Sequence, residues 1–398
     1  MKILVINAGS SSLKYQFMDS ESGYVIAKGL CERIGIDGAM TYKPTGREPV
    51  KFSDALKDHT DAIKLVINTL TDPEIGVIKS MDEIDAVGHR MVHGGEKFAK
   101  SVLITEEVIQ TVESLNSLAP LHNPANLMGV RACMEIMPDV PMVGVFDTAF
   151  HQTMPREAFL YGLPYEAYTD HMVRRYGFHG TSHLYVSRKA IEMLGKPAEE
   201  TKVVTCHLGN GSSITAVQGG KSIDTTMGFT PLDGVLMGTR CGAVDPSAVT
   251  FLMEKHGFTP AEMSDYMNKR SGFLGVSGVG SDNRDVTEAA EHGNKRAQLA
   301  KDILVYEIKK DIGAFAVAMN GVDAILFTGG IGENAPDVRE CVCAEMDFLG
   351  IKIDTVMNAG VKGKLAKVSQ SDSAVQVWVV PTNEELLIAR DTLALIQK

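Results

Sequence analysis

The chain has 398 residues, of which 44% are hydrophobic and 22% charged, a composition typical of a globular protein with two or three domains. Its formal net charge of −11 argues against a broad surface for a nucleic-acid backbone, so any anionic ligand must be held by a few local basic residues. The longest apolar stretch, residues 312–327, is interrupted by polar residues and too short to cross a bilayer, and no signal peptide is recognisable. We therefore expect a cytoplasmic protein without nucleic-acid or membrane partners.

The cysteines are scattered, and only the last two are close together. They are Cys31, Cys133, Cys206, Cys241, Cys341 and Cys343. The C-x-C spacing of the last pair lacks the second pair that a structural zinc site needs. We expect all of them to be buried, reduced thiols.

One segment pattern occurs twice. Residues 2–14 (KILVINAGSSSLK) read as a strand, a Gly/Ser turn and a second strand, and residues 202–214 (KVVTCHLGNGSSI) repeat this order. Glycine lets the backbone approach an anion closely, so turn N–H groups and serine hydroxyls can donate to phosphate oxygens. The repetition favours two like domains that bind one nucleotide, and the alternative is two ordinary hairpin turns.

Strand-like and helix-like segments alternate throughout, which predicts an α/β fold. After the first hairpin we expect strands at residues 24–33, 41–44, 84–92 and 141–146. Helices are expected from Ser53, from Thr105, and from Asn123 as N-cap with proline next. The strand at 141–146 delivers Asp147 at its carboxyl end, where catalytic residues of open α/β sheets tend to lie.

The second half restarts with the repeated hairpin and ends in a glycine-rich turn. We expect a helix capped by Asp245, a long helix over 294–319 and a strand over 323–328 that runs into Gly329-Gly-Ile-Gly-Glu-Asn334. Helix N–H groups at such a strand-to-helix turn can face a phosphate. The segment is not a G-x-G-x-x-G fingerprint, and no G-x-x-x-x-G-K-[ST] loop occurs, which argues against Rossmann dehydrogenases and P-loop kinases.

Two arginines lie among glycines, Arg90 in GHRMVHGG and Arg240 in MGTRCG. The planar guanidinium matches carboxylate and phosphoryl oxygens, although a lone arginine is usually a solvated surface residue. Arg90 lies in an apolar strand, which weakens the surface interpretation.

His179 precedes His183 by four residues, a spacing that superficially resembles a zinc motif. The glutamate of H-E-x-x-H is missing and Gly180 disfavours a helix, so metal binding there is not expected. We interpret His179 as a donor to a phosphoryl group, with an ordinary loop histidine as the alternative.

A magnesium ion would need one or two carboxylates, because it keeps most of its waters. Asp147 and Glu384 are candidates. Glu384 can equally be an acid in the first turn of a helix capped by Asn383.

A series of motifs resembles the acetate kinase family, in the family's order and over essentially the whole chain. They are NAGSSSLK (7–14), GHRMVHGG (88–95), FDTAFH (146–151), YGFHGTS (176–182), HLGNGSS (207–213), MGTR (237–240), SDNR (281–284), GGIGEN (329–334) and PTNEE (381–385). The resemblance implies the actin-like superfamily of sugar and acetate kinases, with two duplicated actin-like (ribonuclease H-like) domains facing a nucleotide cleft. It places the domains at residues 1–147 with a C-terminal helix at 385–398, and at 148–384.

The implied reaction is ATP + acetate ⇌ ADP + acetyl phosphate, by direct in-line transfer with Mg²⁺ or Mn²⁺. By resemblance, Arg90 binds the carboxylate or phosphoryl group, and His179 and Arg240 stabilise the phosphoryl group in flight. Asp147 positions or deprotonates the acetate side, and Asn7 and Glu384 help to hold the metal. The implied nucleotide contacts are Lys14, His207, Leu208, Gly209, Asn210, Gly211, Asp282, Asn283, Arg284, Gly330, Ile331, Gly332, Glu333 and Asn334. The implied apolar pocket for the acetate methyl group is Val92, Leu121, Phe178 and Pro231.

Other functions remain open at this point. A propionate or other short-chain carboxylate kinase would share these motifs. A sugar kinase of the same superfamily would need polar groups for hydroxyls where the implied pocket is apolar, and a chaperone-like ATPase would lack the small-acid site. From the resemblance we also expect a homodimer.

Overall fold

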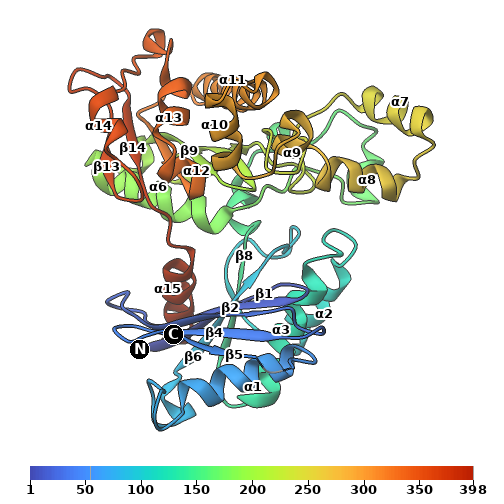
Figure 1. The fold of residues 1–398 in the computed structure, drawn as a ribbon, viewed down its shortest axis with the longest axis vertical. Coiled ribbons are helices and arrows are strands. Elements are labelled where there is room, and N and C mark those ends of the chain that lie inside the picture. The colour runs from blue at the N-terminus through green and yellow to red at the C-terminus, as the bar shows by residue number, and fades with distance from the viewer. Residues whose placement is uncertain (54, 398) are drawn as a thin grey trace. The chain divides into compact units, whose positions relative to one another are not determined.

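The computed structural model describes residues 1–53 and 55–397. The chain divides into two compact units, unit 1 with residues 1–150 and 383–398 and unit 2 with residues 151–382 (Figure 1). The domain boundaries expected from the sequence, after residues 147 and 384, remain predictions. No helix in the described part of the chain is long and apolar enough to cross a membrane.

Unit 1 is built on one sheet with the strand order β5-β4-β3-β2-β1-β6-β8-β7. Its strands are β1 (Lys2–Ala8), β2 (Ser12–Asp19), β3 (Val25–Glu32), β4 (Ala39–Pro44), β5 (Val50–Phe52), β6 (Ala86–Met91), β7 (Val102–Leu103) and β8 (Met142–Phe146). Its α-helices are α1 (His59–Leu70), α2 (Glu106–Ser114), α3 (Asn123–Ile136) and α15 (Glu384–Ile396).

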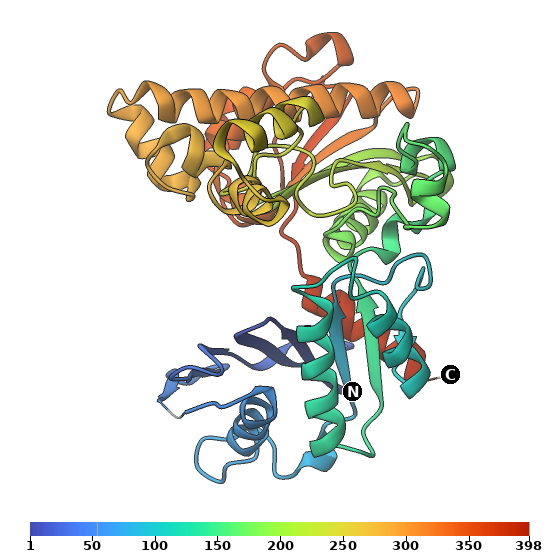
Figure 2. The same cartoon turned by 90° about the vertical axis from the view of Figure 1, so that its right-hand side faces the viewer.

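Helices cover the two faces of this sheet differently. Apolar residues of α1 and α3 form one core with the inward residues of β1 to β4. On the other face, α15 packs so closely that a Cβ at Gly88 of β6 would lie 2.7 Å from the Ile388 side chain. Figure 2 shows α3 and α15 on opposite sides of the strands. On its face of the sheet, α15 contacts β1, β6 and β8.

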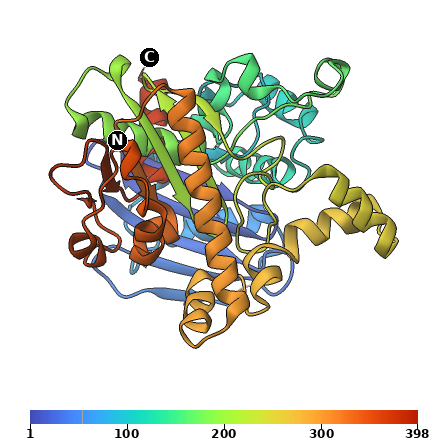
Figure 3. The same ribbon diagram turned by 90° about the horizontal axis from the view of Figure 1, so that it is seen from above.

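Unit 2 is built on a second sheet with the order β11-β10-β9-β12-β14-β13. Its strands are β9 (Lys202–Leu208), β10 (Ser212–Gln218), β11 (Lys221–Thr225), β12 (Ala324–Thr328), β13 (Ala366–Lys367) and β14 (Gln376–Val379). Its α-helices are α4 (Arg156–Phe159), α5 (Glu166–Thr169), α6 (Gly180–Leu194), α7 (Pro246–His256), α8 (Pro260–Lys269), α9 (Gly272–Ser277), α10 (Asn283–Glu291), α11 (Lys295–Ala318), α12 (Gly329–Asn334), α13 (Pro336–Cys343) and α14 (Thr355–Ala359). The long helix α11 lies over this sheet (Figure 3) and joins its apolar core.

The two sheets share five strands with the same order and directions. In unit 1, β3, β2 and β1 are antiparallel neighbours, and β6 and β8 follow parallel to β1. In unit 2, β11, β10 and β9 are antiparallel neighbours, and β12 and β14 follow parallel to β9. The repeated Gly/Ser hairpin therefore marks the repetition of a whole sheet, and the predicted α/β fold with duplicated domains is confirmed.

Some local expectations are wrong. The first helix begins at His59 rather than Ser53, because Asp58 caps it by accepting a hydrogen bond from the Asp61 N–H. Gly180 does not prevent a helix but begins α6. The cysteines are not all buried, since Cys241 is partly exposed and Cys341 is exposed.

Candidate active site

The carboxyl ends of three neighbouring strands bring Asn7, Arg90 and Asp147 together in unit 1. Asn7 lies near the end of β1, Arg90 lies near the end of β6, and Asp147 directly follows β8. Because these strands pair in parallel, their carboxyl ends meet at one edge of the sheet. Arg90 forms an ion pair with Asp147, whose side chain is 1% exposed, and Arg90 Nη1 donates to Asn7 Oδ1 at 3.4 Å.

Carboxylates keep Arg90 charged. Burial alone would lower the pKa of Arg90, but the negative charges of Asp147, Glu384 and Glu385 outweigh it and raise the pKa above its usual value. Glu384 and Glu385 form the first turn of α15, which Asn383 caps. Glu384 is therefore a first-turn acid and also lies within electrostatic reach of Arg90, so the two interpretations of this residue do not exclude each other.

Two buried asparagines of α3 hold the backbone that follows β6. Asn126 accepts a hydrogen bond from Val92 N at 2.9 Å and donates to Ala8 O at 2.8 Å, which ties the end of β6 to the end of β1. Asn123 is the first residue of α3 rather than its N-cap, and it exchanges two hydrogen bonds with the His93 backbone. Sequence reasoning missed both roles, and the three-residue spacing on one helix face was the available signal.

The apolar residues expected around an acetate methyl group belong to different units. Val92 and Leu121 lie in unit 1, and Phe178 and Pro231 lie in unit 2. Val92 and Phe178 are buried, whereas Leu121 is 74% exposed. The pocket that they would form remains a prediction.

His179 occupies a strained backbone position at the start of α6 in unit 2. Its φ of 55° lies in the left-handed region, which costs a non-glycine residue about 1–2 kcal/mol. The imidazole Nδ1 is 2.9 Å from Ser213 Oγ, and the ring stacks on His207 with 4.3 Å between centroids. The strain and the two side-chain contacts together aim this ring.

A buried hydrogen-bonded chain continues from Ser213 into the interior. Ser213 Oγ is 2.7 Å from His183 Nε2, and His183 Nδ1 is 2.7 Å from Thr205 Oγ1. Burial lowers the pKa of His183 well below its usual value, so this ring is neutral and has one donor and one acceptor nitrogen. Because both hydroxyls can reverse their direction, the chain satisfies His179 Nδ1 as donor or as acceptor. It therefore orients His179 without selecting one protonation state.

Two donor groups converge over the second Gly/Ser turn. A Cβ at Gly211 would lie 3.4 Å from both Arg240 Nη1 and His179 Nε2. Arg240 Nη1 donates to Pro231 O at 3.0 Å, and burial lowers the pKa of Arg240. The absence of a side chain at Gly211 leaves room for a ligand between the turn and these donors.

A pocket of 880 Å³ in unit 2 is lined by eight of the residues expected to contact a nucleotide. They are Gly209, Asn210, Asp282, Asn283, Arg284, Gly330, Ile331 and Asn334. The volume falls in the range of small-molecule and cofactor sites, roughly 300–1,000 Å³. Asn283 is 9% exposed, and its Oδ1 has no hydrogen-bond partner within the described residues. An unsatisfied carbonyl oxygen in a pocket wall is an acceptor available to a ligand.

The other expected nucleotide residues do not line this pocket. Lys14 belongs to unit 1, and His207, Leu208, Gly211, Gly332 and Glu333 lie elsewhere in unit 2. Leu208 is fully buried in the core. The sequence did not single out Thr287 and Glu291, which line the pocket at helical spacing after Asn283, or Lys362, which no motif marks.

Two charged side chains, one of them fully buried, hold the walls of the pocket from behind. Glu333 Oε1 accepts hydrogen bonds from Gly329 N at 2.9 Å and Thr382 N at 3.2 Å, so it caps its own helix. Arg339, which is fully buried, donates to Gly332 O at 2.9 Å and also to Asn358 and Val361 O. Burial lowers the pKa of Arg339 to about 10.

The comparisons with known proteins agree over the full length. The model of the acetokinase family matches residues 2–390. The chain belongs to this family. An acetate kinase from Caldanaerobacter subterraneus subsp. tengcongensis is 60% identical over 100% of this chain and 99% of its own length, and one from Methanosarcina acetivorans is 58% identical over 98% and 96%.

Solved structures of the acetokinase family share the fold. The crystal structure of Porphyromonas gingivalis acetate kinase superposes with a TM-score of 0.97 at 50% identity, covering 99% of both chains. A propionate kinase from Francisella tularensis superposes with a TM-score of 0.92 at 39% identity over the same share of both chains. The predictions of family, actin-like fold and a phosphotransferase with a carboxyl acceptor are confirmed. Membership also removes the sugar kinase and chaperone-like alternatives.

Proposed function

We propose that this enzyme transfers the γ-phosphoryl group of ATP to acetate, reversibly and in line, in the cytoplasm. The observation that carries the proposal is the convergence of His179 and Arg240 on the Gly211 turn, beside the nucleotide-sized pocket of unit 2. The loose transition state of phosphoryl transfer spreads negative charge over three equatorial oxygens, so positioned hydrogen-bond donors and cations are the groups that this reaction needs. Propionate is the alternative acceptor, supported by the likeness to a propionate kinase.

The nucleotide is proposed to bind in the pocket of unit 2. The turn at Gly209–Gly211 and the start of α12 offer backbone N–H groups to the phosphates. Asn283 Oδ1 offers its unsatisfied acceptor to the exocyclic amine of a purine. Asp282 caps α10 and pairs with Arg284, which lowers the pKa of Asp282 to about 2, so this carboxylate remains ionised and keeps Arg284 at the pocket wall.

Arg90 is proposed to bind the carboxylate of acetate. Asp147 and Asn7 each accept one hydrogen bond from its guanidinium, which has five N–H donors, so donors remain for a carboxylate of the ligand. Acetate is already ionised at neutral pH, since its pKa is close to that of Glu, about 4.3. Asp147 therefore orients Arg90 and does not need to remove a proton.

The residues of unit 1 also fit a magnesium ion. Asn7 Oδ1 and the Glu384 carboxylate are hard oxygen donors, the type that Mg²⁺ prefers, and both lie near Arg90. Bound Mg²⁺, or Mn²⁺ in its place, would neutralise phosphate charge. We further propose a homodimer, as the resemblance to the family implies.

Trapping of the product with hydroxylamine tests the proposed reaction. With ATP, Mg²⁺ and acetate, the enzyme should form acetohydroxamate, and the rate should fall with propionate and again with butyrate. Omission of acetate is the control for slow ATP hydrolysis. ATP consumption without hydroxamate would contradict the proposal, and faster turnover of propionate would favour the alternative acceptor.

A further inference from the structure

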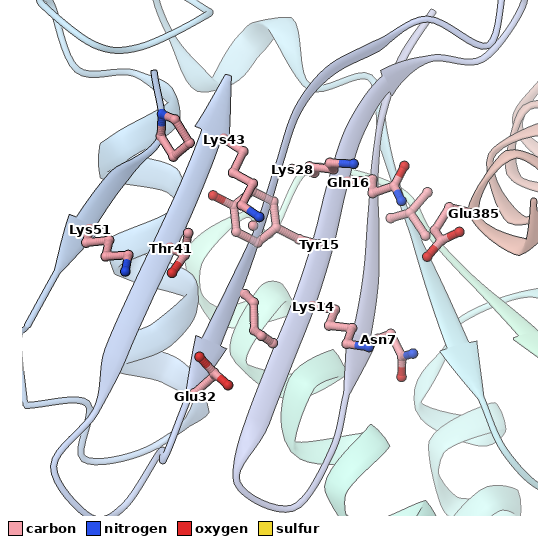
Figure 4. A pocket seen from close by; sticks show the side chains of 14 residues that line it. Asn7, Lys14, Tyr15, Gln16, Lys28, Glu32, Thr41, Lys43, Lys51 and Glu385 are labelled. Atoms are coloured by element: carbon pink, nitrogen blue, oxygen red, sulfur yellow. The ribbon is translucent and has the colours of Figure 1, made fainter. Parts of the chain in front are cut away.

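The open face of the unit 1 sheet carries four lysines on four neighbouring strands. Lys14 lies on β2, Lys28 on β3, Lys43 on β4 and Lys51 on β5, and all are exposed. Figure 4 shows these side chains over the strands, with Asn7 beside Lys14. The helix on this side of the sheet, α15, contacts β1, β6 and β8, so the part over β2 to β5 forms a basic face.

The strand register brings these charges together. Lys28 and Lys43 are directly opposite each other in the antiparallel pair of β3 and β4. Lys14 pairs with Leu30, Leu30 with Thr41, and Thr41 with Lys51, so the other two lysines lie in the adjacent row on the same face. Like charges directly opposite across strands destabilise a sheet.

Nothing within the described chain neutralises these lysines. None of the four makes a hydrogen bond or ion pair with any described residue. The protein is strongly acidic, with a net charge of −11, so carboxylates were abundantly available to pair with them. An uncompensated lysine cluster on an acidic protein is the arrangement expected of a site for an anion.

The same face is hollowed into a pocket of 740 Å³. The four lysines line it together with the uncharged polar side chains Asn7, Gln16 and Thr41, and two carboxylates, Glu32 and Glu385, also reach it. Positive charge is therefore in excess. The volume corresponds to a small molecule, because sites of about 300–1,000 Å³ bury ligands of drug size.

We propose that this basic face is a second anion site, which binds a small phosphorylated molecule with clustered phosphate groups, such as an oligophosphate. Lysine ammonium groups act as mobile point charges that suit a chain of phosphates without fixed geometry. The bounded pocket and the acidic remainder of the surface disfavour a long polyanion or a membrane, because both would extend over repulsive charge. The site shares no lining residue with the pocket in unit 2, and Lys28, Lys43 and Lys51 have no expected role in the kinase reaction, whereas Asn7 and Lys14 at its edge are also residues expected to serve that reaction.

Calorimetric titration with inorganic tripolyphosphate tests the site without turnover. ADP is kept saturating so that the nucleotide pocket is filled, and the buffer is at low ionic strength. Wild-type protein should still bind tripolyphosphate. The double variant Lys28→Gln/Lys43→Gln should bind it at least about tenfold more weakly, whereas the matched control Lys64→Gln/Lys100→Gln, which removes two exposed charges elsewhere in unit 1, should bind like wild type.

Two outcomes would overturn the proposal. One is no binding by the ADP-saturated wild type, and the other is equal weakening in both double variants, which would indicate a general charge effect. Kinase activity without tripolyphosphate should be unchanged in Lys28→Gln/Lys43→Gln, because neither residue belongs to the proposed active site. A failure of the kinase proposal would therefore appear in the hydroxamate assay and not in this titration.

The midpoint of thermal unfolding shows whether weaker binding by the double variant reflects loss of the site or loss of folding. Removal of the Lys28–Lys43 repulsion should raise the midpoint at low salt, and the rise should shrink as salt screens the pair. Tripolyphosphate should raise the midpoint of wild type more than that of the variant. If tripolyphosphate raises both midpoints equally, these two lysines do not form the site.

Discussion

Substitution of Ser213 by alanine tests whether the buried chain aims His179. The substitution removes a single heavy atom, Ser213 Oγ, which lies 2.9 Å from His179 Nδ1 and 2.7 Å from His183 Nε2. The substitution adds no bulk. It leaves His183, which is fully buried, without its Nε2 partner, and removes one of the contacts that hold the His179 ring.

The loss of stability and the loss of activity in Ser213→Ala can both be given an expected size. An unsatisfied polar group in the interior costs about 1–3 kcal/mol, which lowers the thermal midpoint by about 2–4 °C per kcal/mol in a unit of this size. A ring that moves by a fraction of an ångström loses alignment with the transition state. Loss of such a supporting contact typically costs about 10- to 100-fold, so kcat should fall by this factor, or ~1.4–2.7 kcal/mol in barrier.

Steady-state kinetics with acetate and ATP separates positioning from mere destabilisation. Ser213→Ala should lower kcat while the KM for ATP stays nearly constant, because Ser213 does not line the nucleotide pocket. Ser187→Ala is the matched control, since Ser187 is 1% exposed in the same unit and, among the described residues, its Oγ bonds only to Leu184 O at 3.1 Å. A folded Ser213→Ala enzyme with the kcat of the control would refute the reasoning.

Five further substitutions test other parts of the protein. Replacement of Arg90 or Arg240 by alanine should lower kcat/KM by about 10³-fold, and near-normal turnover in folded Arg240→Ala would remove that residue from the mechanism. Glu384→Ala should raise the Mg²⁺ concentration for half-maximal activity more than the acetate KM; an unchanged Mg²⁺ dependence with a lower thermal midpoint would leave Glu384 as a first-turn acid only. Val92→Ala should raise kcat/KM for propionate relative to acetate, by no more than the ~1–3 kcal/mol that one methylene is worth, and should leave the nucleotide KM unchanged. A constant ratio of the two kcat/KM values would show that Val92 does not line the pocket. Burial lowers the pKa of His89 to about 3, below the unfolded value of about 6.5. The unfolded chain therefore binds more protons between these pH values, and the free energy of unfolding should fall by about 2 kcal/mol from pH 7 to pH 5. If His89→Leu does not flatten this dependence of the free energy of unfolding on pH, His89 is not its cause.

The duplicated architecture was predictable from the sequence because a hairpin with a Gly/Ser turn is a local signal. Strand, turn and strand lie within about a dozen residues, and their register is set by the turn. The first helix was harder, since Ser53 and Asp58 are both acceptable N-caps and only packing selects the second. The cost of Gly180 in a helix, about 1 kcal/mol, is overcome by tertiary contacts of the buried Thr181, Ser182 and His183.

The groups that touch one another across the sheet could not be derived from local patterns. Arg90 and Asp147 are 57 residues apart, and only the parallel pairing of β6 and β8 joins them. The hydrogen bonds from Asn126 to Val92 and Ala8 depend likewise on the packing of α3. The resemblance to the family implies roles for these residues, which remain predictions, but not the partners through which they are held.

Glu333 shows why a motif alone does not separate ligand contacts from their support. A loop that presents backbone N–H groups to a phosphate must have its remaining N–H and carbonyl groups satisfied from the other side, since unpaired buried groups are costly. Glu333 supplies the acceptor for Gly329 N and Thr382 N, and Arg339 supplies donors for Gly332 O. Both side chains are as necessary to this loop as its glycines, yet their charged groups bond to the protein and not to a ligand. A charged residue inside a phosphate motif is therefore assigned to the ligand only after its hydrogen bonds within the protein have been counted.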